Sequence, residues 1–249
     1  MEFLITTIVA VIFFVGVVSS CPSVCSCTDT SDGVNVNCYN RRLDSIPTDL
    51  PDNTYKLRLS HNNIRVIQDS TFNNLSSLKY LYLQNNDITV IKENTFNNLP
   101  HLNSINLNYN SIQVMEDNAF SNLPNLKHLH FHQNDISVIE DNTFNNLPSL
   151  YTLSLEHNDI SVIEDNTFSN LQNLHILYLS YNKITSITSD TFNNLTNLQV
   201  LGLGNNDISV IEDNTFNNLP SLQRLNLGHN DISVIEDNTF NNLPSLQRL

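Results

Sequence analysis

The sequence predicts an α/β-type repeat solenoid dominated by β-structure, in which short strands from successive coils form one parallel sheet. Three observations support this fold class. From Thr54 onward the sequence repeats with a 24-residue period, leucines two residues apart recur within the units, and four cysteines cluster ahead of the first unit. The eight expected units occupy residues 54–245, residues 246–249 start a ninth, and the units begin at Thr54, Leu78, Leu102, Leu126, Leu150, Leu174, Leu198 and Leu222.

Each unit carries the apolar residues that one coil needs. In the second unit Leu81 and Leu83 are two residues apart, so on a strand both side chains point to the same, interior face. Ile88, Ile91 and Phe96 follow on the return path and close the core from the other side. Stacked units therefore predict a parallel sheet with about 4.8 Å between strands.

Two residue types recur at single repeat positions. Phe predicts a buried stack of rings along the convex side: Phe72, Phe96, Phe120, Phe144, Phe168, Phe192, Phe216 and Phe240. Asn recurs near the end of each strand: Asn62, Asn86, Asn110, Asn134, Asn158, Asn182, Asn206 and Asn230. A buried amide without partners costs about 1–3 kcal/mol, so these amides are expected to bond the backbone of adjacent coils.

Residues 1–20 precede the fold. An almost continuous apolar run from Phe3 to Val18 is followed by small residues, which predicts a secretory signal peptide cleaved before Cys21. The run is short for a membrane-spanning helix. Its leading residues include Glu2 and no Lys or Arg, which is atypical, so a retained signal anchor is the alternative. No later stretch is apolar enough to cross a bilayer.

The cysteines and the composition narrow the class of protein. Cys21, Cys25, Cys27 and Cys38 lie in the expected N-terminal segment 21–53, and an even number in an exported chain predicts two disulfides. A zinc site is the alternative, and the spacing leaves three connectivities open. With a formal net charge of −14, the chain is a poor candidate for binding nucleic acid, whose affinity comes mainly from Lys and Arg.

The repeat resembles the typical leucine-rich repeat of extracellular proteins. The run from Cys21 to Cys27, then Cys38, then Leu43-Asp44-Ser45-Ile46-Pro47, resembles that family's cysteine-rich N-terminal cap. The resemblance implies the pairs Cys21–Cys27 and Cys25–Cys38. It also implies a curved horseshoe with a parallel concave sheet that binds ligands and an irregular convex side. A cap would cover the open apolar end of the first coil.

The sequence departs from the family at its other end. Extracellular members usually finish with a C-terminal cysteine-rich cap, whereas this sequence stops at Leu249, inside an expected strand. We interpret this as an incomplete gene product. An end-to-end dimer and a naturally uncapped protein are the alternatives.

The exposed strand positions predict a recognition face. Units four, seven and eight share a long framework run but differ at these positions, which suits a surface whose side chains select a partner. Tyr and His gather there, and Tyr combines large apolar area with a polar tip. Aromatic residues also suit strands in general, but that alternative does not explain the His bias. The candidate ligand-binding residues are Lys56, Arg58, Tyr80, Tyr82, Asn106, Tyr109, His128, His130, His132, Ser154, Glu156, His157, Tyr178, Tyr181 and Arg224.

Charge is segregated between the two faces. Cations lie at exposed strand positions with Glu156 as the acid among them, while most acids lie elsewhere in the units. The expected partner is therefore a protein or glycan ligand, with an acidic protein patch or an anionic glycan as candidates. The repeated acids elsewhere are interpreted as a solvated surface.

The run His128-x-His130-x-His132 is the sharpest chemical motif. Period two puts the three rings on one face, and Glu156 should lie beside His132 because equal positions of adjacent units are neighbours. His130, His132 and Glu156 form a weak candidate metal site, since residues i and i+2 on a strand are about 6.6–7 Å apart. A pH-sensitive patch is a second alternative, and ordinary contact residues are preferred.

Two sequons occur at the ends of units, at Asn74 and Asn194, and predict glycosylation away from the strands; a chance match is the alternative. No nucleophile with a base and no Gly-rich phosphate loop is present, so we expect neither an enzyme nor a cofactor.

The sequence therefore predicts an extracellular recognition protein, secreted or on the cell surface. The resemblance extends to variable lymphocyte receptors and other capped repeat receptors, which implies an immune-type or cell-surface receptor ectodomain. The alternative is a secreted matrix or adhesion protein similar to the small leucine-rich proteoglycans or to guidance ligands.

Overall fold

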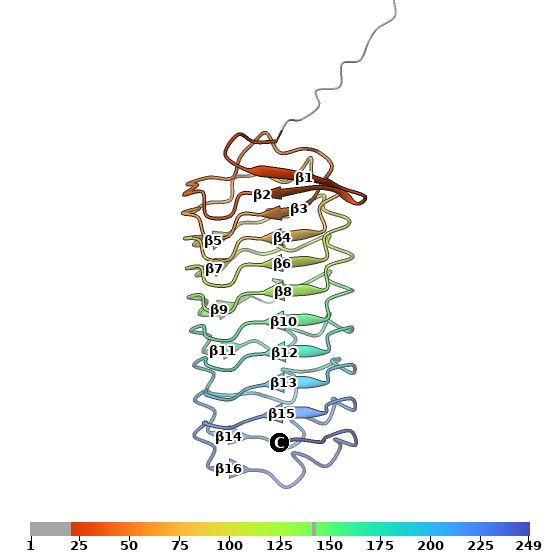
Figure 1. The fold of residues 1–249 in the computed structure, drawn as a ribbon. Coiled ribbons are helices and arrows are strands. Elements are labelled where there is room, and N and C mark those ends of the chain that lie inside the picture. The colour runs from red at the N-terminus through yellow and green to blue at the C-terminus, as the bar shows by residue number, and fades with distance from the viewer. Residues whose placement is uncertain (1–20, 141–142) are drawn as a thin grey trace, which may run out of the picture.

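The computed structural model describes residues 21–140 and 143–249, and the signal peptide expected at residues 1–20 lies outside them. One ten-stranded sheet runs through the molecule in the order β1-β2-β3-β4-β6-β8-β10-β12-β13-β15 (Figure 1). Its strands are β1 (Ser26–Thr30), β2 (Gly33–Asn37), β3 (Thr54–Arg58), β4 (Tyr80–Tyr82), β6 (Ser104–Asn106), β8 (His128–His130), β10 (Thr152–Ser154), β12 (Ile176–Tyr178), β13 (Val200–Gly202) and β15 (Arg224–Asn226). Each coil contributes one strand, which confirms the predicted solenoid.

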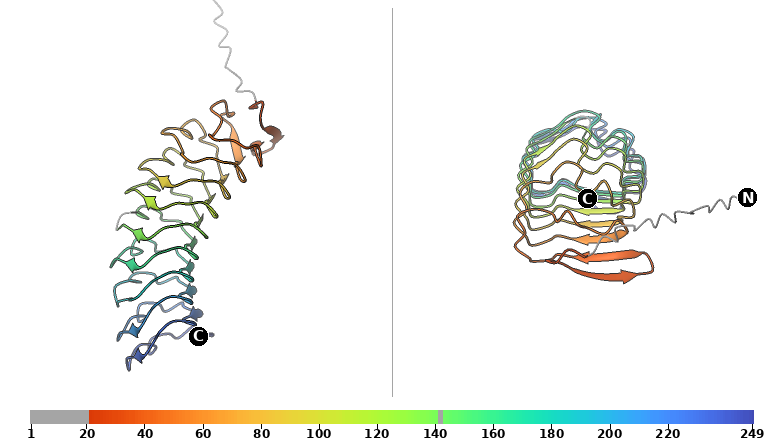
Figure 2. Two further views of the ribbon diagram at one scale, coloured as in Figure 1. Left: turned by 90° about the vertical axis from the view of Figure 1, so that its left-hand side faces the viewer. Right: turned by 90° about the horizontal axis from the view of Figure 1, so that it is seen from above.

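The stack of coils curves, and the ten-stranded sheet lies on the inner side of the curve (Figure 2). The outer side is irregular except where two-residue strands pair in parallel: β5 (Val90–Ile91) with β7 (Val114–Met115), β9 (Val138–Ile139) with β11 (Val162–Ile163), and β14 (Val210–Ile211) with β16 (Val234–Ile235). In the described residues no outer strand occurs in the first unit, which has Val66 at the equal position, or in the sixth unit, which has Ser186 there.

The register of the sheet follows the repeat. Leu57, Leu81 and Ile105 pair across β3, β4 and β6, and all three side chains are fully buried. Their strand neighbours on either side point outward to the concave face. Equal repeat positions therefore stand side by side along the sheet, as the sequence predicts.

The Phe residues form the predicted spine under the outer side. Consecutive rings from Phe72 to Phe168 stack with centroids 5.4–6.4 Å apart, and Phe192, Phe216 and Phe240 continue the pattern. All except Phe240 are buried.

The recurring Asn residues form a hydrogen-bonded ladder. Asn158 is representative: its Nδ2 donates to the carbonyl oxygens of Phe131 and Leu155, both at 3.0 Å, and its Oδ1 accepts from the backbone N–H of Ile136 at 3.1 Å. One side chain thus ties two coils together at the bend after the strand, which confirms the predicted structural role.

The N-terminal segment covers the first coil. The antiparallel β1–β2 hairpin extends the sheet beyond β3, and Val34 and Val36 are buried within the continuous core. The disulfides Cys21–Cys27 and Cys25–Cys38 hold the hairpin to the segment before it, with the pairing that the family resemblance implies.

Candidate functional site

The concave face consists of two long rows of outward side chains. One row runs from Lys56 through Tyr80, Ser104, His128, Thr152, Ile176 and Val200 to Arg224. The other runs from Arg58 through Tyr82, Asn106, His130, Ser154, Tyr178 and Gly202 to Asn226. The framework is almost invariant, so these rows carry the chemical variety of the sheet.

Cations and tyrosines meet at the N-terminal end of this face. The Lys56 ammonium lies 5.6 Å from the ring centroids of both Tyr80 and Tyr82. The Arg58 guanidinium lies 5.9 Å from the Tyr82 ring. Such cation–π contacts contribute about 0.5–1 kcal/mol at exposed sites. The structure therefore brings these four predicted residues together as one positively charged aromatic patch.

The histidines occupy the middle of the face, on β8 and the turn that follows it. His128 Nδ1 lies 3.3 Å from Thr152 Oγ1, and His130 Nδ1 lies 3.2 Å from Ser154 Oγ. Thr152 and Ser154 are themselves buried, since the larger rings of the neighbouring coil cover them. Ser154 therefore holds the His130 ring in place and offers little exposed surface to a ligand.

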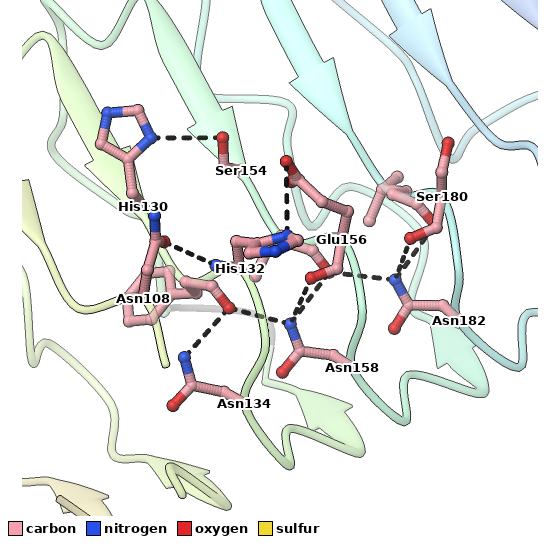
Figure 3. Close-up of polar contacts among 12 residues, drawn as sticks. Asn108, His130, His132, Asn134, Ser154, Glu156, Asn158, Ser180 and Asn182 are labelled. Carbon is pink, nitrogen blue, oxygen red and sulfur yellow. Dashed lines mark hydrogen bonds and ion pairs between the residues drawn. The ribbon is translucent and has the colours of Figure 1, made fainter. Parts of the chain in front are cut away.

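His132 lies beside Glu156, as the equal repeat positions predict. Figure 3 shows the two side chains facing each other, and His132 Nδ1 is 3.8 Å from Glu156 Oε1. That distance is too long for a hydrogen bond. His132 Nδ1 and Glu156 Oε2 are both buried and have no hydrogen-bond partner.

The side chains of His130, His132 and Glu156, the weak candidate metal site, do not converge on one point. The His130 ring is directed at Ser154, away from the His132–Glu156 pair (Figure 3). Within residues 21–140 and 143–249, no group of three or more His, Cys, Asp or Glu side chains is arranged to hold a metal ion. Side chains two residues apart on a strand are too widely spaced to converge without help from another element.

The residue three positions after each of the strands β3, β4, β6, β8, β10, β12, β13 and β15 has a left-handed backbone, which the sequence reasoning missed. These residues include Tyr109, His157 and Tyr181, with φ values of 55°, 55° and 58°. Asn85 and Asn205 at the same repeat position are the available signal, because Asn tolerates this conformation best after Gly.

This backbone turn sends aromatic side chains to one edge of the face. His157 and Tyr181 stack with ring centroids 4.1 Å apart, and the Tyr109 ring meets His132 edge-on at 5.3 Å. Tyr178 lies inside this edge on β12, over the space left by Gly202, where an added Cβ would be 3.3 Å from the Tyr178 ring.

Not every candidate residue joins these groups. Arg224 is exposed on β15, two strands beyond Tyr178, among small residues such as Gly202 and Gly228. Asn106 is half-buried, and its Oδ1 accepts a hydrogen bond from the backbone N–H of Asn108. The face thus has a cationic end, a histidine-rich centre with one aromatic edge, and a shallow far end.

Burial shifts the pKa values of the ionisable side chains at the centre of the concave face. It lowers the pKa of His130, with the nearby His128 as a smaller cause, and it lowers the pKa of His132. Burial also raises the pKa of Glu156. Because His132 and Glu156 are not hydrogen-bonded to each other, the loss of solvation on burial is the main cause of the pKa shift of each residue.

Folding stability is therefore expected to fall as the pH drops below about 6.5, the pKa of histidine in unfolded chains. The unfolded chain takes up the proton at higher pH than buried His130 does, so acid favours unfolding. Urea unfolding of wild type and of His130→Gln at several pH values tests this. The variant should lose less stability between about pH 6.5 and 5. An equal loss in both proteins would show that His130 is not the group responsible.

The flank of the solenoid carries a hollow that sequence reasoning did not identify. It has a volume of about 1040 Å³ and extends over the first five units, with Asn97, Asn98, Pro100, Asn122 and Pro148 among the residues lining it. Both sequon residues, Asn74 and Asn194, are exposed and occupy the repeat position of Asn98 and Asn122. They therefore lie on this flank and away from the concave face.

The repeat, the Asn ladder and the Phe spine define a class of protein, and comparison with known families agrees. The family model described as Leucine rich repeat matches residues 52–112, 100–160, 148–208 and 196–249. The chain belongs to the leucine-rich-repeat family.

Among curated proteins, the leucine-rich repeat-containing protein 3 of Rattus norvegicus is 37% identical over 73 residues, which is 29% of this chain and 28% of that protein. The chain therefore spans well under half the length of this relative.

Solved structures share the fold. The chain in a Drosophila Toll–Spätzle complex gives a TM-score of 0.75 at 23% identity, covering 78% of this chain and 26% of that one. Human 5T4, a Wnt-activated inhibitory factor and trophoblast glycoprotein, gives 0.66 at 26% identity, covering 84% and 81%. A TLR13–ssRNA13 complex gives 0.63 at 29% identity, covering 80% and 33%.

Proposed function

We propose that this protein binds a macromolecular ligand outside the cell through the concave face of its solenoid, as an immune-type or cell-surface receptor ectodomain. One observation carries the proposal. The two rows of outward side chains hold tyrosines, histidines and cations over a nearly constant framework. Tyrosine and arginine dominate the energetics of many protein interfaces.

The chemistry of the face favours a protein ligand over nucleic acid. The solved relatives include a complex with the protein Spätzle and a complex with single-stranded RNA. This chain has 11 Lys and Arg against 25 Asp and Glu, and RNA affinity depends strongly on contacts between cations and phosphates. Lys56 and Arg58 at the N-terminal end of the face are separated from Arg224 and Arg248 at the far end by Glu156 and the histidines, so these cations do not form one continuous nucleic-acid groove.

Two features support an extracellular location. The disulfides Cys21–Cys27 and Cys25–Cys38 persist in oxidising compartments. The exposed Asn74 and Asn194 sequons are accessible for glycosylation in the secretory pathway. In residues 21–140 and 143–249, no helix has the length and hydropathy needed to cross a bilayer.

A binding screen tests the proposal. The chain is displayed as a multimer on an array of purified extracellular proteins, and each hit is remeasured with single variants by surface plasmon resonance. Tyr82→Ala, His130→Ala and Tyr178→Ala are expected to weaken binding at least tenfold each, about 1.4 kcal/mol.

Val138→Ser is the matched control, because Val138 is exposed on the outer side of the same solenoid. Its affinity should equal that of wild type, and far-UV circular dichroism checks that every variant is folded. Wild-type affinity in all three concave variants, with a loss in Val138→Ser, would move the binding site to the outer side.

A further inference from the structure

The N-terminal end of the concave face contains a small hollow where the cap meets the first two coils. The ends of β2, β3 and β4 pair there, with Asn37 opposite Arg58 and Arg58 opposite Tyr82. The residues two positions after Asn37, Arg58 and Tyr82 are Tyr39, Ser60 and Gln84. Backbone hydrogen bonds join Asn40 to Ser60, and His61 to Gln84, so this second row also stands side by side.

The hollow exists because its central residue is small. Ser60 is only 4% exposed and is flanked by the larger Tyr39 and Gln84. All six of these side chains line a volume of about 440 Å³: Asn37, Tyr39, Arg58, Ser60, Tyr82 and Gln84. Arg58 is exposed and lies next to Ser60 in this array, so its guanidinium can reach a group that enters the hollow.

The positive charge at this hollow is uncompensated. The ion pairs of residues 21–140 and 143–249 do not include Arg58, whose guanidinium instead lies over the Tyr82 ring. Lys56 also lies near this ring, with its ammonium 5.6 Å from the centroid.

We propose that this hollow is a subsite for the carboxylate of a single Asp or Glu side chain of the protein ligand. A guanidinium presents parallel N–H donors that match a carboxylate in a bidentate pair. The rings of Tyr39 and Tyr82 would pack against the methylene groups of the acidic side chain. The inference rests on the proposed function, because it names a chemical group that the concave ligand must carry.

A sulfated glycan fits this surface less well. Polyanionic chains gain affinity from many cations spaced along a groove. Here Lys56 and Arg58 are close together, whereas the centre of the face has Glu156 and histidines with lowered pKa values, which separate this pair from Arg224 and Arg248 at the far end. One buried anionic group is therefore better matched than a chain of sulfates.

Titration with a defined peptide tests the subsite directly. An end-capped pentapeptide with one central Glu between glycines, and its Gln twin, are added to the protein labelled with ¹⁵N-arginine. The Arg58 Nε–Hε signal, assigned by its absence in Arg58→Gln, is followed by NMR. We expect a saturable shift with the Glu peptide in the millimolar range, since a single partly exposed ion pair is weak.

The Gln twin should give at least a tenfold smaller affinity, and Arg224→Gln should keep the response to the Glu peptide. No shift at Arg58, or equal shifts with both peptides, would overturn the subsite. Stronger binding of a heparin tetrasaccharide at the Arg58 signal than of the Glu peptide would overturn its assignment to a protein ligand.

The subsite and the proposed function fail in different ways. If Tyr178→Ala abolishes binding of an array-selected ligand while Arg58→Gln does not, the concave function stands and the subsite is rejected. If the Glu peptide shifts Arg58 but concave variants never affect the selected ligand, the hollow binds a carboxylate, but the concave function is rejected and with it the assignment of the hollow to the protein ligand. If both hold, Arg58→Gln should weaken the selected ligand at least tenfold.

Discussion

Replacing Phe120 by alanine is expected to lower the free energy of unfolding by about 3–5 kcal/mol. Phe120 is fully buried, and its ring contacts Phe96 and Phe144 in the spine and Phe131 edge-on, with centroids 5.4, 6.4 and 5.5 Å away. Each coil of a solenoid is stabilised mainly by its neighbours. Removing this ring therefore weakens two interfaces and leaves a cavity that the strands cannot close without losing register.

Urea unfolding followed by far-UV circular dichroism measures the change, and Val114→Ala in the same unit is the control. Val114 is 49% exposed on the outer side, so its replacement should cost less than about 1 kcal/mol. Equal effects of the two substitutions would mean that the Phe spine contributes no more to stability than an exposed side chain does.

Replacing Asn158 by alanine is expected to lower the free energy of unfolding by about 1–3 kcal/mol. The substitution leaves the N–H of Ile136 without its partner at a site that is 7% exposed. It also removes one of the two Asn donors from the carbonyl oxygens of Phe131 and Leu155, which keep Asn134 and Asn182. Asn158→Asp should be at least as damaging, because it removes both donors and places a carboxylate near carbonyl oxygens.

Asn170→Ala is the matched control for the ladder. Asn170 is exposed, and its Nδ2 donates to Asn145 Oδ1 on the flank. Its loss should change the free energy of unfolding by about 0.5 kcal/mol or less. Hydrogen exchange locates the effect: in Asn158→Ala, protection should fall first in the coils that contain β8 and β10. Uniform loss along the whole solenoid would contradict a local tie between neighbouring coils.

The sequence was sufficient for most of the framework. The leucine spacing predicts which strand residues face inward, and Leu57, Leu81 and Ile105 are buried accordingly. Equal repeat positions become neighbours because the coils stack in register, which correctly places Glu156 beside His132. A period strong enough to fix the core therefore also fixes which concave residues are adjacent.

The sequence could not decide how those neighbours orient. Spacing alone left His130, His132 and Glu156 as a conceivable metal site, but the Ser154 hydroxyl takes the His130 ring away from the other two. The left-handed backbone at His157 and Tyr181, which stacks these rings at one edge, was also missed, because the only sequence signal for it is the Asn at the same position of two other units. Side-chain direction depends on local hydrogen bonds and dihedral angles, which a repeat pattern does not encode.

By itself, the sequence determined the solenoid, its buried Phe spine and its Asn ladder, because each follows from a period that the stacking of coils must obey. Only the tertiary structure decided the hollow at Arg58. The cap lies outside the 24-residue repeat, and its strand β2 joins β3 with a register shift between Val34 and Asn35. That irregular pairing places Asn37 beside Arg58 and Tyr39 beside Ser60, and no repeat rule relates the cap to the first coil.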